Sequence, residues 1–284
     1  MDTIHVVGDY GPAGEMAWSE LDIAFSAPTL ACRVVPTVVP KFNTIAAGFV
    51  AAQLSRGLNR ACDCLLVNVD PRTDNDRPVS DGSGAPFVGA VLESGLRVFS
   101  PNAGHCLSFL KPRIKACYLL HDGCAHGQFR SRDLFPRLIA QVTRQGFGER
   151  DAFDRSKIAD APLQVVGFVD GYGNVKTTMT RGQAIASGWA PGKALFVAVG
   201  RKGKRKVLCA SSIMGVLPGE FVLAPGSSGD PNDPFMEFAV RAIAGSSGRL
   251  SGVSRLGYPE PGTRFDLRPF VEVCQRIPAR VRAS

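Results

Sequence analysis

The sequence predicts a two-domain α/β protein, in which an N-terminal layered α/β domain precedes a smaller, β-barrel-like C-terminal domain. Its 284 residues suffice for one large or two smaller domains. The 31 glycines and 20 prolines favour many tight turns and substantial β structure over a helical bundle. Strand and helix patterns alternate up to about residue 150, and short apolar runs between turn residues follow.

The first domain is expected over residues 1–150. Its strands are expected around 4–7, 33–39, 65–69, 98–99 and 118–120, and its helices around 16–25, 44–56 and 134–142. This alternation is typical of a mostly parallel sheet covered by helices. Asp133 is expected to cap the helix that follows it, which places Pro136 in the first turn.

The second domain is expected over residues 161–284, after a polar stretch, Gly146 to Asp160, that we interpret as a linker. Its apolar runs cover 164–169, 195–199, 221–224 and 235–239. The basic run 201–206 separates two apolar segments and is interpreted as a solvated hairpin turn. Short runs at such spacing favour a barrel or a sandwich.

The formal charge of +8 raises the question of nucleic acid. The basic residues neither concentrate in one segment nor alternate with aromatic residues, so an anionic or zwitterionic small ligand explains them at least as well. No apolar run is long enough to cross a bilayer, and neither a signal peptide nor a membrane partner is expected. The eight cysteines form no CxxC pair, which favours free thiols in the cytoplasm.

Cys117, His121, Cys124 and His126 are the candidates for a metal site. Their irregular spacing matches no familiar zinc module, so no metal site is expected.

Carboxylates follow two of the expected strands. Asp9 comes directly after the first strand, at the edge where open α/β sheets bind ligands, and a carboxylate there can accept both hydroxyls of a ribose. The alternative is a turn aspartate that stabilises the bend at 8–11. Asp70 follows the 65–69 strand, and Arg77 lies seven residues on; the two either position water or another nucleophile, or form a surface ion pair.

Three further segments carry candidate ligand groups. Residues 129–133 lead into a helix N-terminus, which suits an anion, although plain capping uses the same residues. In 170–174, two glycines permit a turn that aims Tyr172 and Asn174 at a ligand, as they also permit an ordinary β-turn. Residues 225–229 either cradle a carboxylate with N–H groups and hydroxyls or form a flexible loop.

The order of these motifs along the chain resembles one family, the S-adenosylmethionine hydroxide adenosyltransferases, whose relatives include the fluorinase and the chlorinase. The resemblance runs from about residue 4 to residue 245, with an apparent insertion at Asp230 to Pro234. The matching segments are Gly8-Asp9-Tyr10-Gly11, Val69-Asp70-Pro71 with Arg77, Ser100-Pro101-Asn102-Ala103-Gly104, Phe129-Arg130-Ser131-Arg132-Asp133, Val169-Asp170-Gly171-Tyr172-Gly173-Asn174, Pro225-Gly226-Ser227-Ser228-Gly229 and Phe235-Met236-Glu237-Phe238-Ala239.

The resemblance implies a set of substrate-binding residues for S-adenosylmethionine. Asp9 would hold the ribose hydroxyls and Phe42 would lie beside the ribose. Asp170 would bind the methionine ammonium, Tyr172 would stack on adenine and Asn174 would bond its edge. The remaining members of the implied set are Ser227 and Ser228 at the methionine carboxylate, together with Asn102 and Phe129. The family forms trimers with each site shared by two subunits, so a homotrimer is expected, with no cofactor besides the substrate.

The resemblance also implies the chemistry, an in-line displacement at ribose C5′ that releases methionine. The water-using branch carries an Asp–Arg–His set; Asp70 and Arg77 match its first two members, which favours an adenosine-forming hydrolase. The family histidine falls at Arg130, which cannot act as a base near neutral pH, and Ser131 matches a serine that lies near halide in the fluorinase. The catalytic set is therefore Asp70, Arg77, Arg130 and Ser131.

This departure leaves alternatives open. Either His126 replaces the missing histidine, or halide or another nucleophile is used, or the protein binds S-adenosylmethionine or adenosine without turnover.

Overall fold

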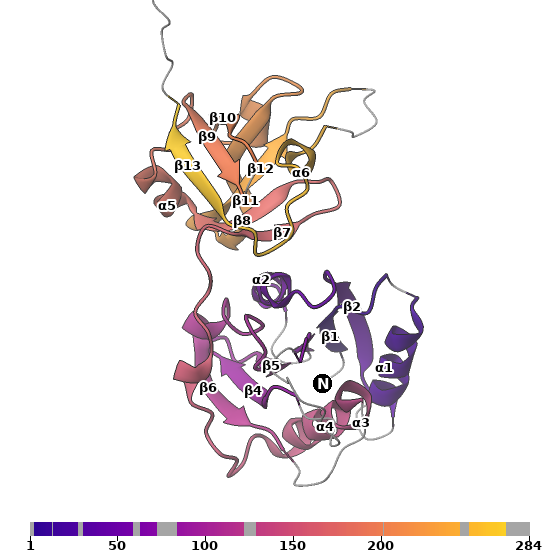
Figure 1. Cartoon of the computed structure of the whole chain (residues 1–284). Coiled ribbons are helices and arrows are strands. Elements are labelled where there is room, and N and C mark those ends of the chain that lie inside the picture. The colour runs from indigo at the N-terminus through magenta and orange to yellow at the C-terminus, as the bar shows by residue number, and fades with distance from the viewer. Residues whose placement is uncertain are drawn as a thin grey trace, which may run out of the picture.

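The computed structural model describes residues 3–12, 14–27, 31–58, 63–72, 84–121, 129–200, 202–244 and 250–270. Within them the chain forms two sheets, one in each half (Figure 1). The first sheet is layered between helices and the second curls on itself. The predicted fold class, an α/β half followed by a barrel-like β half, is confirmed.

The first sheet has the strand order β2-β1-β3-β5-β4-β6. Its strands are β1 (Thr3–Gly8), β2 (Arg33–Val38), β3 (Asp63–Asn68), β4 (Phe87–Leu92), β5 (Arg97–Pro101) and β6 (Ile114–Leu119). The first four in spatial order run parallel, but β4 lies antiparallel between β5 and β6. The sheet is mostly parallel, as expected, but no strand was expected at the position of β4. This strand is antiparallel because a short hairpin, and not a helix, joins it to β5.

Helices cover both faces of this sheet. Alternate residues of the central strands β1 and β3 enter two separate cores, which is why these strands read as continuous apolar runs. One core includes α2 (Thr44–Leu54), and the other includes α1 (Met16–Ser26) and α4 (Phe135–Gln145). The three-layered arrangement follows from the pattern on these strands.

One local expectation in this half was wrong. A short helix, α3 (Arg130–Asp133), precedes α4, and the N-cap position of α4 is Leu134, without a side-chain cap. Asp133 instead pairs with Arg132 at 2.6 Å, so it is not the cap; Pro136 does lie in the first turn of α4.

The segment 146–160 packs on the first sheet and is not a free linker. Ala152 forms a β-bridge with Tyr118, and Ile158 belongs to the core beside α2. Between them lies a 3₁₀ turn at Arg155–Lys157, capped by Asp154. Further 3₁₀ turns lie at Lys111–Arg113 and Ile213–Gly215.

The second sheet has the order β13-β9-β10-β11-β12-β8-β7. Its strands are β7 (Val166–Val169), β8 (Val175–Thr180), β9 (Ala194–Val199), β10 (Arg205–Cys209), β11 (Phe221–Asp230), β12 (Asp233–Val240) and β13 (Phe265–Pro269), accompanied by α5 (Arg181–Ala186) and α6 (Gly252–Arg255). A bridge between Val165 and Arg264 joins its two edges, so the sheet curls into a half-barrel.

The segment Pro225–Gly229 is part of β11, where the pairing with β12 shifts at a bulge, and is not a free loop. The chain turns between Asp230 and Asp233, which face each other across the β11–β12 hairpin. The apparent insertion at 230–234 is therefore the hairpin's tip and the start of β12.

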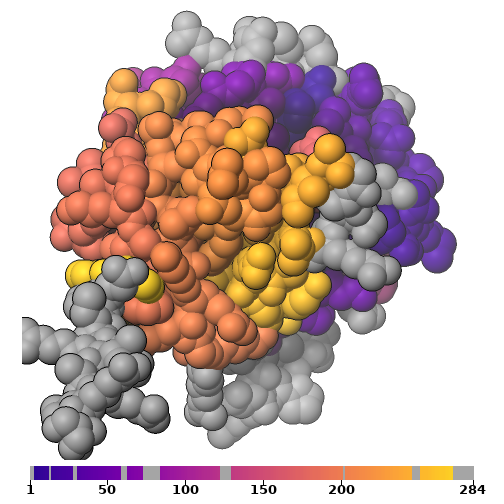
Figure 2. Space-filling model, turned by 90° about the horizontal axis from the view of Figure 1, so that it is seen from above, coloured from indigo at the N-terminus to yellow at the C-terminus, as the bar shows by residue number. Residues whose placement is uncertain are grey.

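The two halves meet at α2, which contacts β7 and β11 (Figure 1). Seen from above, the second half covers much of the first (Figure 2). Among the described residues, no helix combines the length and the apolar character needed to cross a membrane.

Candidate functional site

The carboxyl edge of the first sheet brings together most of the predicted residues of the N-terminal half. Asp9, Asp70 and Asn102 follow β1, β3 and β5, which run parallel and end on the same side. The backbone N–H of Phe42 donates to Asp9 Oδ2 at 2.8 Å. Phe42 has a positive φ of 59°, and its ring is 69% exposed. Asp9 therefore fixes a strained residue whose ring remains open to a ligand.

Tyr10 joins this edge, although sequence reasoning gave it no role. Its hydroxyl accepts a hydrogen bond from Asn68 Nδ2, and its ring packs edge-on against Trp18. Burial and, to a smaller extent, the Asp9 carboxylate raise the pKa of Tyr10 to about 12, although a hydrogen bond with Ser131 acts in the opposite direction. Ser131 is thus placed beside Tyr10. The available signal for a role of Tyr10 was its position directly after Asp9 in the motif Gly8-Asp9-Tyr10-Gly11.

Asp70 forms an ion pair with Arg130, the residue onto which the resemblance places a histidine. Arg130 Nη1 lies 3.6 Å from Asp70 Oδ2, and the two side chains are 10% and 13% exposed. Backbone N–H groups of Arg72 and Ala85 donate to the two oxygens of Asp70, at 3.3 and 3.1 Å. The carboxylate is therefore held in place by the backbone as well as by the guanidinium.

Arg130 is held equally firmly. Its Nη2 donates to Ala85 O at 2.9 Å, and its guanidinium lies 5.3 Å from the centroid of the Phe135 ring. Burial lowers its pKa, with Arg72 adding to the effect and Asp70 opposing it. Within the described residues its Nη1 is buried and has no hydrogen-bond partner, since 3.6 Å is too long for one.

Gly84 packs against this pair. A Cβ added there would overlap both Arg130 Nη1 and Asp70 Oδ2, so a side chain would push the pair apart. Arg77, the predicted partner of Asp70, lies outside the described residues, as do Cys124 and His126.

Cys106 lies beneath the two carboxylates. Its thiol donates to Val69 O at 3.2 Å, and it is fully buried. Burial raises the pKa of this thiol, and the charges of Asp70 and Asp9 raise it further. The thiol therefore stays protonated near neutral pH and is unsuited to act as a nucleophile.

The two other predicted residues of this half take different positions. Asn102 Nδ2 donates to Lys157 O at 3.1 Å and so ties the sheet edge to the 146–160 segment. Phe129 is 52% exposed, and the Arg132 guanidinium lies 5.0 Å from its ring centroid.

In the second half, Asp170 organises the turn between β7 and β8. Its Oδ1 accepts the backbone N–H groups of Tyr172 and Asn174, both at 3.0 Å, and its Oδ2 accepts Asn174 Nδ2 at 3.2 Å. The Tyr172 side chain is left 87% exposed. The turn interpretation and the ligand interpretation of this motif are thus compatible.

Lys176 forms a charged cluster that sequence reasoning missed. Its ammonium lies 2.9 Å from Glu237 Oε2, 3.1 Å from Ser227 Oγ and 3.7 Å from Asp170 Oδ2. The side chains of Lys176 and Glu237 are only 15% and 5% exposed. The available signal was a lone lysine in an otherwise apolar and hydroxylated strand. This cation occupies the space between Asp170, the expected ammonium ligand, and Ser227, the expected carboxylate ligand.

Ser228 lies apart from this cluster. It is 3% exposed, and its hydroxyl has no hydrogen-bond partner among the described residues. None of the hydrogen bonds or ion pairs described for these residues joins the group around Asp70 to the group around Lys176.

No cluster of three potential metal ligands occurs in the described part of the chain. Of the four candidate metal ligands, His121 lies 3.9 Å from Asp151, and Cys117 donates to Phe153 O at 3.0 Å. The five described cysteines, Cys32, Cys64, Cys106, Cys117 and Cys209, are free thiols and buried.

No family model and no curated protein matches the chain. Two solved structures are similar along nearly its whole length. An uncharacterized conserved protein from Thermotoga maritima has a TM-score of 0.67 at 18% identity, covering 93% of this chain and 99% of its own. A conserved hypothetical protein from Thermus thermophilus has a TM-score of 0.64 at 20% identity, covering 94% and 100%. At such identities the likeness is one of fold, and the chain shares its fold with both proteins.

Proposed function

We propose that the protein cleaves S-adenosylmethionine at the ribose C5′, with water as the nucleophile, and releases adenosine and methionine. The observation that carries the proposal is the buried Asp70–Arg130 pair at the sheet edge that also holds Asp9, in which Arg130 Nη1 makes no hydrogen bond with any described residue. The resemblance described from the sequence supplies the substrate, and this pair supplies a place for the nucleophile.

The ribose is assigned to Asp9. The Phe42 N–H fixes one oxygen of its carboxylate, which orients the group toward a vicinal diol at the end of β1. Phe42, Phe129 and Tyr172 are exposed large apolar residues of the described chain. Such exposed aromatic faces suit a substrate held between two copies of the chain, so the proposal includes a homotrimer in the cytoplasm.

The reaction is a displacement at carbon. The water oxygen forms a bond to C5′ while the C5′–S bond breaks. The electron pair of the C5′–S bond goes to sulfur, which leaves as the neutral thioether of methionine. Arg130 Nη1 donates to the water and fixes its position. Asp70 accepts the proton that the water loses and passes it to solvent. The leaving group needs no acid, so the work of the protein is alignment and electrostatic preorganisation.

A second candidate is favoured by the same guanidinium. A buried N–H that has no hydrogen-bond partner among the described residues is also a site for an anion. Halide in place of water would give a 5′-halo-adenosine and methionine.

The test is incubation of the protein with S-adenosylmethionine in ¹⁸O-labelled water, without and with added chloride or fluoride, and mass spectrometry of the products. We expect adenosine that carries the label at its 5′ oxygen, together with unlabelled methionine. A 5′-halo-adenosine formed only with halide would support the second candidate. Tight binding of intact S-adenosylmethionine without products would make the protein a binder and overturn both.

A further inference from the structure

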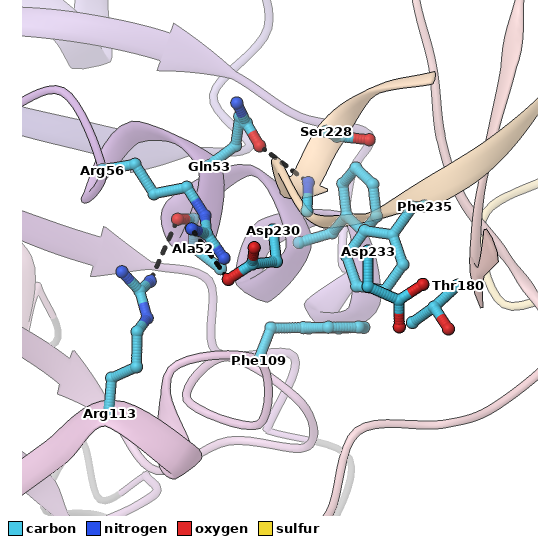
Figure 3. Close-up of a pocket in the computed structure, with 12 residues that line it drawn as sticks. Ala52, Gln53, Arg56, Phe109, Arg113, Thr180, Ser228, Asp230, Asp233 and Phe235 are labelled. Atoms are coloured by element: carbon cyan, nitrogen blue, oxygen red, sulfur yellow. Dashed lines mark hydrogen bonds and ion pairs between the residues drawn. The ribbon is translucent and has the colours of Figure 1, made fainter. Parts of the chain in front are cut away.

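A small cavity lies between the two halves of the chain, and none of its lining residues belongs to the Asp70–Arg130 group (Figure 3). Its volume is about 200 Å³. Residues of α2 and Arg56 line it on one side and the β11–β12 hairpin on another, and Phe109, Arg113 and Thr180 complete it. Of the predicted substrate-binding residues, Ser228 alone lines it.

Three phenyl rings give this cavity an apolar wall. The Phe49 ring lies 5.7 Å from that of Phe109 and 5.4 Å from that of Phe235, measured between centroids. Phe49 is buried, whereas Phe109 and Phe235 are only partly covered and present apolar surface to the cavity. A short apolar side chain fits such a wall.

Two arginines line the cavity: Arg56, which follows α2, and Arg113, from the 3₁₀ turn at Lys111–Arg113 (Figure 3). Arg113 Nη2 is fixed by hydrogen bonds to Ala52 O at 3.1 Å and Ser55 Oγ at 2.6 Å. Burial lowers the pKa of Arg113, and the nearby charge of Arg56 lowers it further. The repulsion between these like charges would be relieved by a carboxylate that accepts from both guanidinium groups.

The hairpin tip contributes two carboxylates. Asp230 Oδ2 is 4.0 Å from Arg56 Nη1, which is too long for a hydrogen bond, and Asp230 Oδ1 accepts the Asn232 N–H at 2.9 Å. Asp233 Oδ1 accepts the Gly182 N–H at 2.8 Å. The two arginines and two aspartates cancel in formal charge, so a ligand of zero net charge with both signs suits the cavity best.

We propose that this cavity binds a free α-amino acid with an apolar side chain. The carboxylate of the ligand lies between Arg56 and Arg113, and its ammonium pairs with Asp230. Its side chain packs on Phe109 and Phe235. An α-amino acid carries its two charges on adjacent groups, which matches the neighbouring Arg56 and Asp230.

Hydrogen bonds within the chain hold the walls of the cavity in place without a ligand. Gln53 on α2 accepts the Gly229 N–H at 3.2 Å and donates to Ser227 O at 3.5 Å, which ties the hairpin to the helix. The tip itself coincides with the apparent insertion at 230–234. The insertion therefore supplies the acidic side of a site built between the two halves, and preorganisation reduces the cost of binding.

The test is calorimetric titration of the full chain with leucine and phenylalanine in the absence of S-adenosylmethionine. Three compounds each lack one feature of leucine: 4-methylpentanoate lacks the ammonium, 3-methylbutylamine lacks the carboxylate, and glycine lacks the apolar side chain. We expect both amino acids to bind and each reduced compound to bind at least about tenfold more weakly. Failure of both amino acids to bind at about 10 mM, or equal binding of 4-methylpentanoate, would overturn the proposal.

Variants place the binding at this cavity. Arg56→Gln and Asp230→Asn are each expected to weaken leucine binding by about tenfold, whereas Arg205→Gln, on the exposed surface of β10, is the matched control. Both cavity variants are expected to keep the wild-type rate of S-adenosylmethionine cleavage, because neither residue belongs to the proposed reaction. Unchanged leucine binding in both variants would rule out this site, whatever the outcome of the cleavage assay.

Discussion

The charged group around Asp70 and Arg130 in the first half and the one around Lys176 in the second differ in how many of their polar atoms find hydrogen-bond partners among the described residues. At the edge of the first sheet, Asp70 and Arg130 approach to 3.6 Å, and the guanidinium keeps an unpaired buried N–H within the described residues. In the second half, the Lys176 ammonium has Glu237, Ser227 and Asp170 around it at 2.9, 3.1 and 3.7 Å.

Lys176 Nζ donates two hydrogen bonds, to Glu237 and Ser227, whereas the buried Arg130 Nη1 makes none with the described residues. A buried donor without a partner is costly unless water or a ligand meets it. The first group therefore has the properties of a place where a reactant is held. The second is a cluster in which Lys176 is shared between Glu237 and Asp170, the residue that the resemblance assigns to the methionine ammonium. The comparison predicts that substitutions in the first group affect both function and stability, whereas substitutions in the second affect mainly stability.

The largest effect is expected for Asp70→Ala. Turnover of S-adenosylmethionine should fall by about a hundredfold or more, because the water loses its proton acceptor. Binding of the substrate should persist, whereas Asp9→Ala should abolish it. The buried Arg130 also loses its counter-charge, which should cost about 3 kcal/mol in the free energy of unfolding.

Three measurements check this prediction: turnover, calorimetric binding of S-adenosylmethionine and urea unfolding. Asp266→Ala, at an exposed position of β13, is the control. Turnover retained in Asp70→Ala would remove the role assigned to this carboxylate.

The next effect is expected for Lys176→Met. Glu237 is 5% exposed and would be left without its cation, so the free energy of unfolding should fall by about 2 to 3 kcal/mol. The double variant Lys176→Met/Glu237→Gln should recover most of this loss, because the uncompensated charge is gone. Urea unfolding of the single and double variants measures both steps. Equal stability of the two variants would show that Lys176 does not compensate the buried charge of Glu237.

The contrast between the two groups also separates what the sequence could predict from what it could not. Asp9 and Asp70 were placed correctly at strand ends, because buried apolar runs identify parallel strands and their carboxyl ends share an edge. The contact between Asp70 and Arg130 joins positions far apart in the chain, and no local pattern predicts such a contact. The Lys176 cluster joins β8, β11 and β12 in the same manner.

The misassigned elements have similar causes. The antiparallel β4 was missed because it pairs through a short hairpin inside an otherwise parallel sheet. Residues 225–229 suggested a loop because Pro, Gly and Ser are turn residues, yet pairing with β12 holds them in a bulged strand. Asp133 was expected as an N-cap, but its carboxylate forms an ion pair with Arg132. In each case a tertiary or neighbouring partner overrode local propensity.

A smaller effect is expected for Gly84→Ala. The added methyl group would overlap Arg130 Nη1 and Asp70 Oδ2, and such overpacking costs about 1 to 3 kcal/mol. Gly171→Ala is the matched control in the second half, since a Cβ there meets no atom within 4 Å. Thermal and urea unfolding should separate the two variants, and the turnover of Gly84→Ala should fall with the displaced pair. Similar stability of both variants would mean that the first group tolerates displacement.

The smallest effect is a pH dependence located at Tyr10. Burial and the Asp9 carboxylate raise its pKa in the folded state to about 12, against an ordinary value of 10.0. Above about pH 10 the unfolded chain loses this proton while the folded chain keeps it, so stability is fully present below the unfolded pKa and falls as pH rises toward the folded pKa. Between about pH 9 and pH 11, the wild type should lose roughly 1 kcal/mol more free energy of unfolding than Tyr10→Phe.

Tyr172→Phe, at an 87% exposed position of the second half, should follow the wild type. Parallel dependences of the free energy of unfolding on pH in the wild type and Tyr10→Phe would show that the phenol is not held protonated beside Asp9. Tyr10 would then no longer count as a link between Asp9 and Ser131.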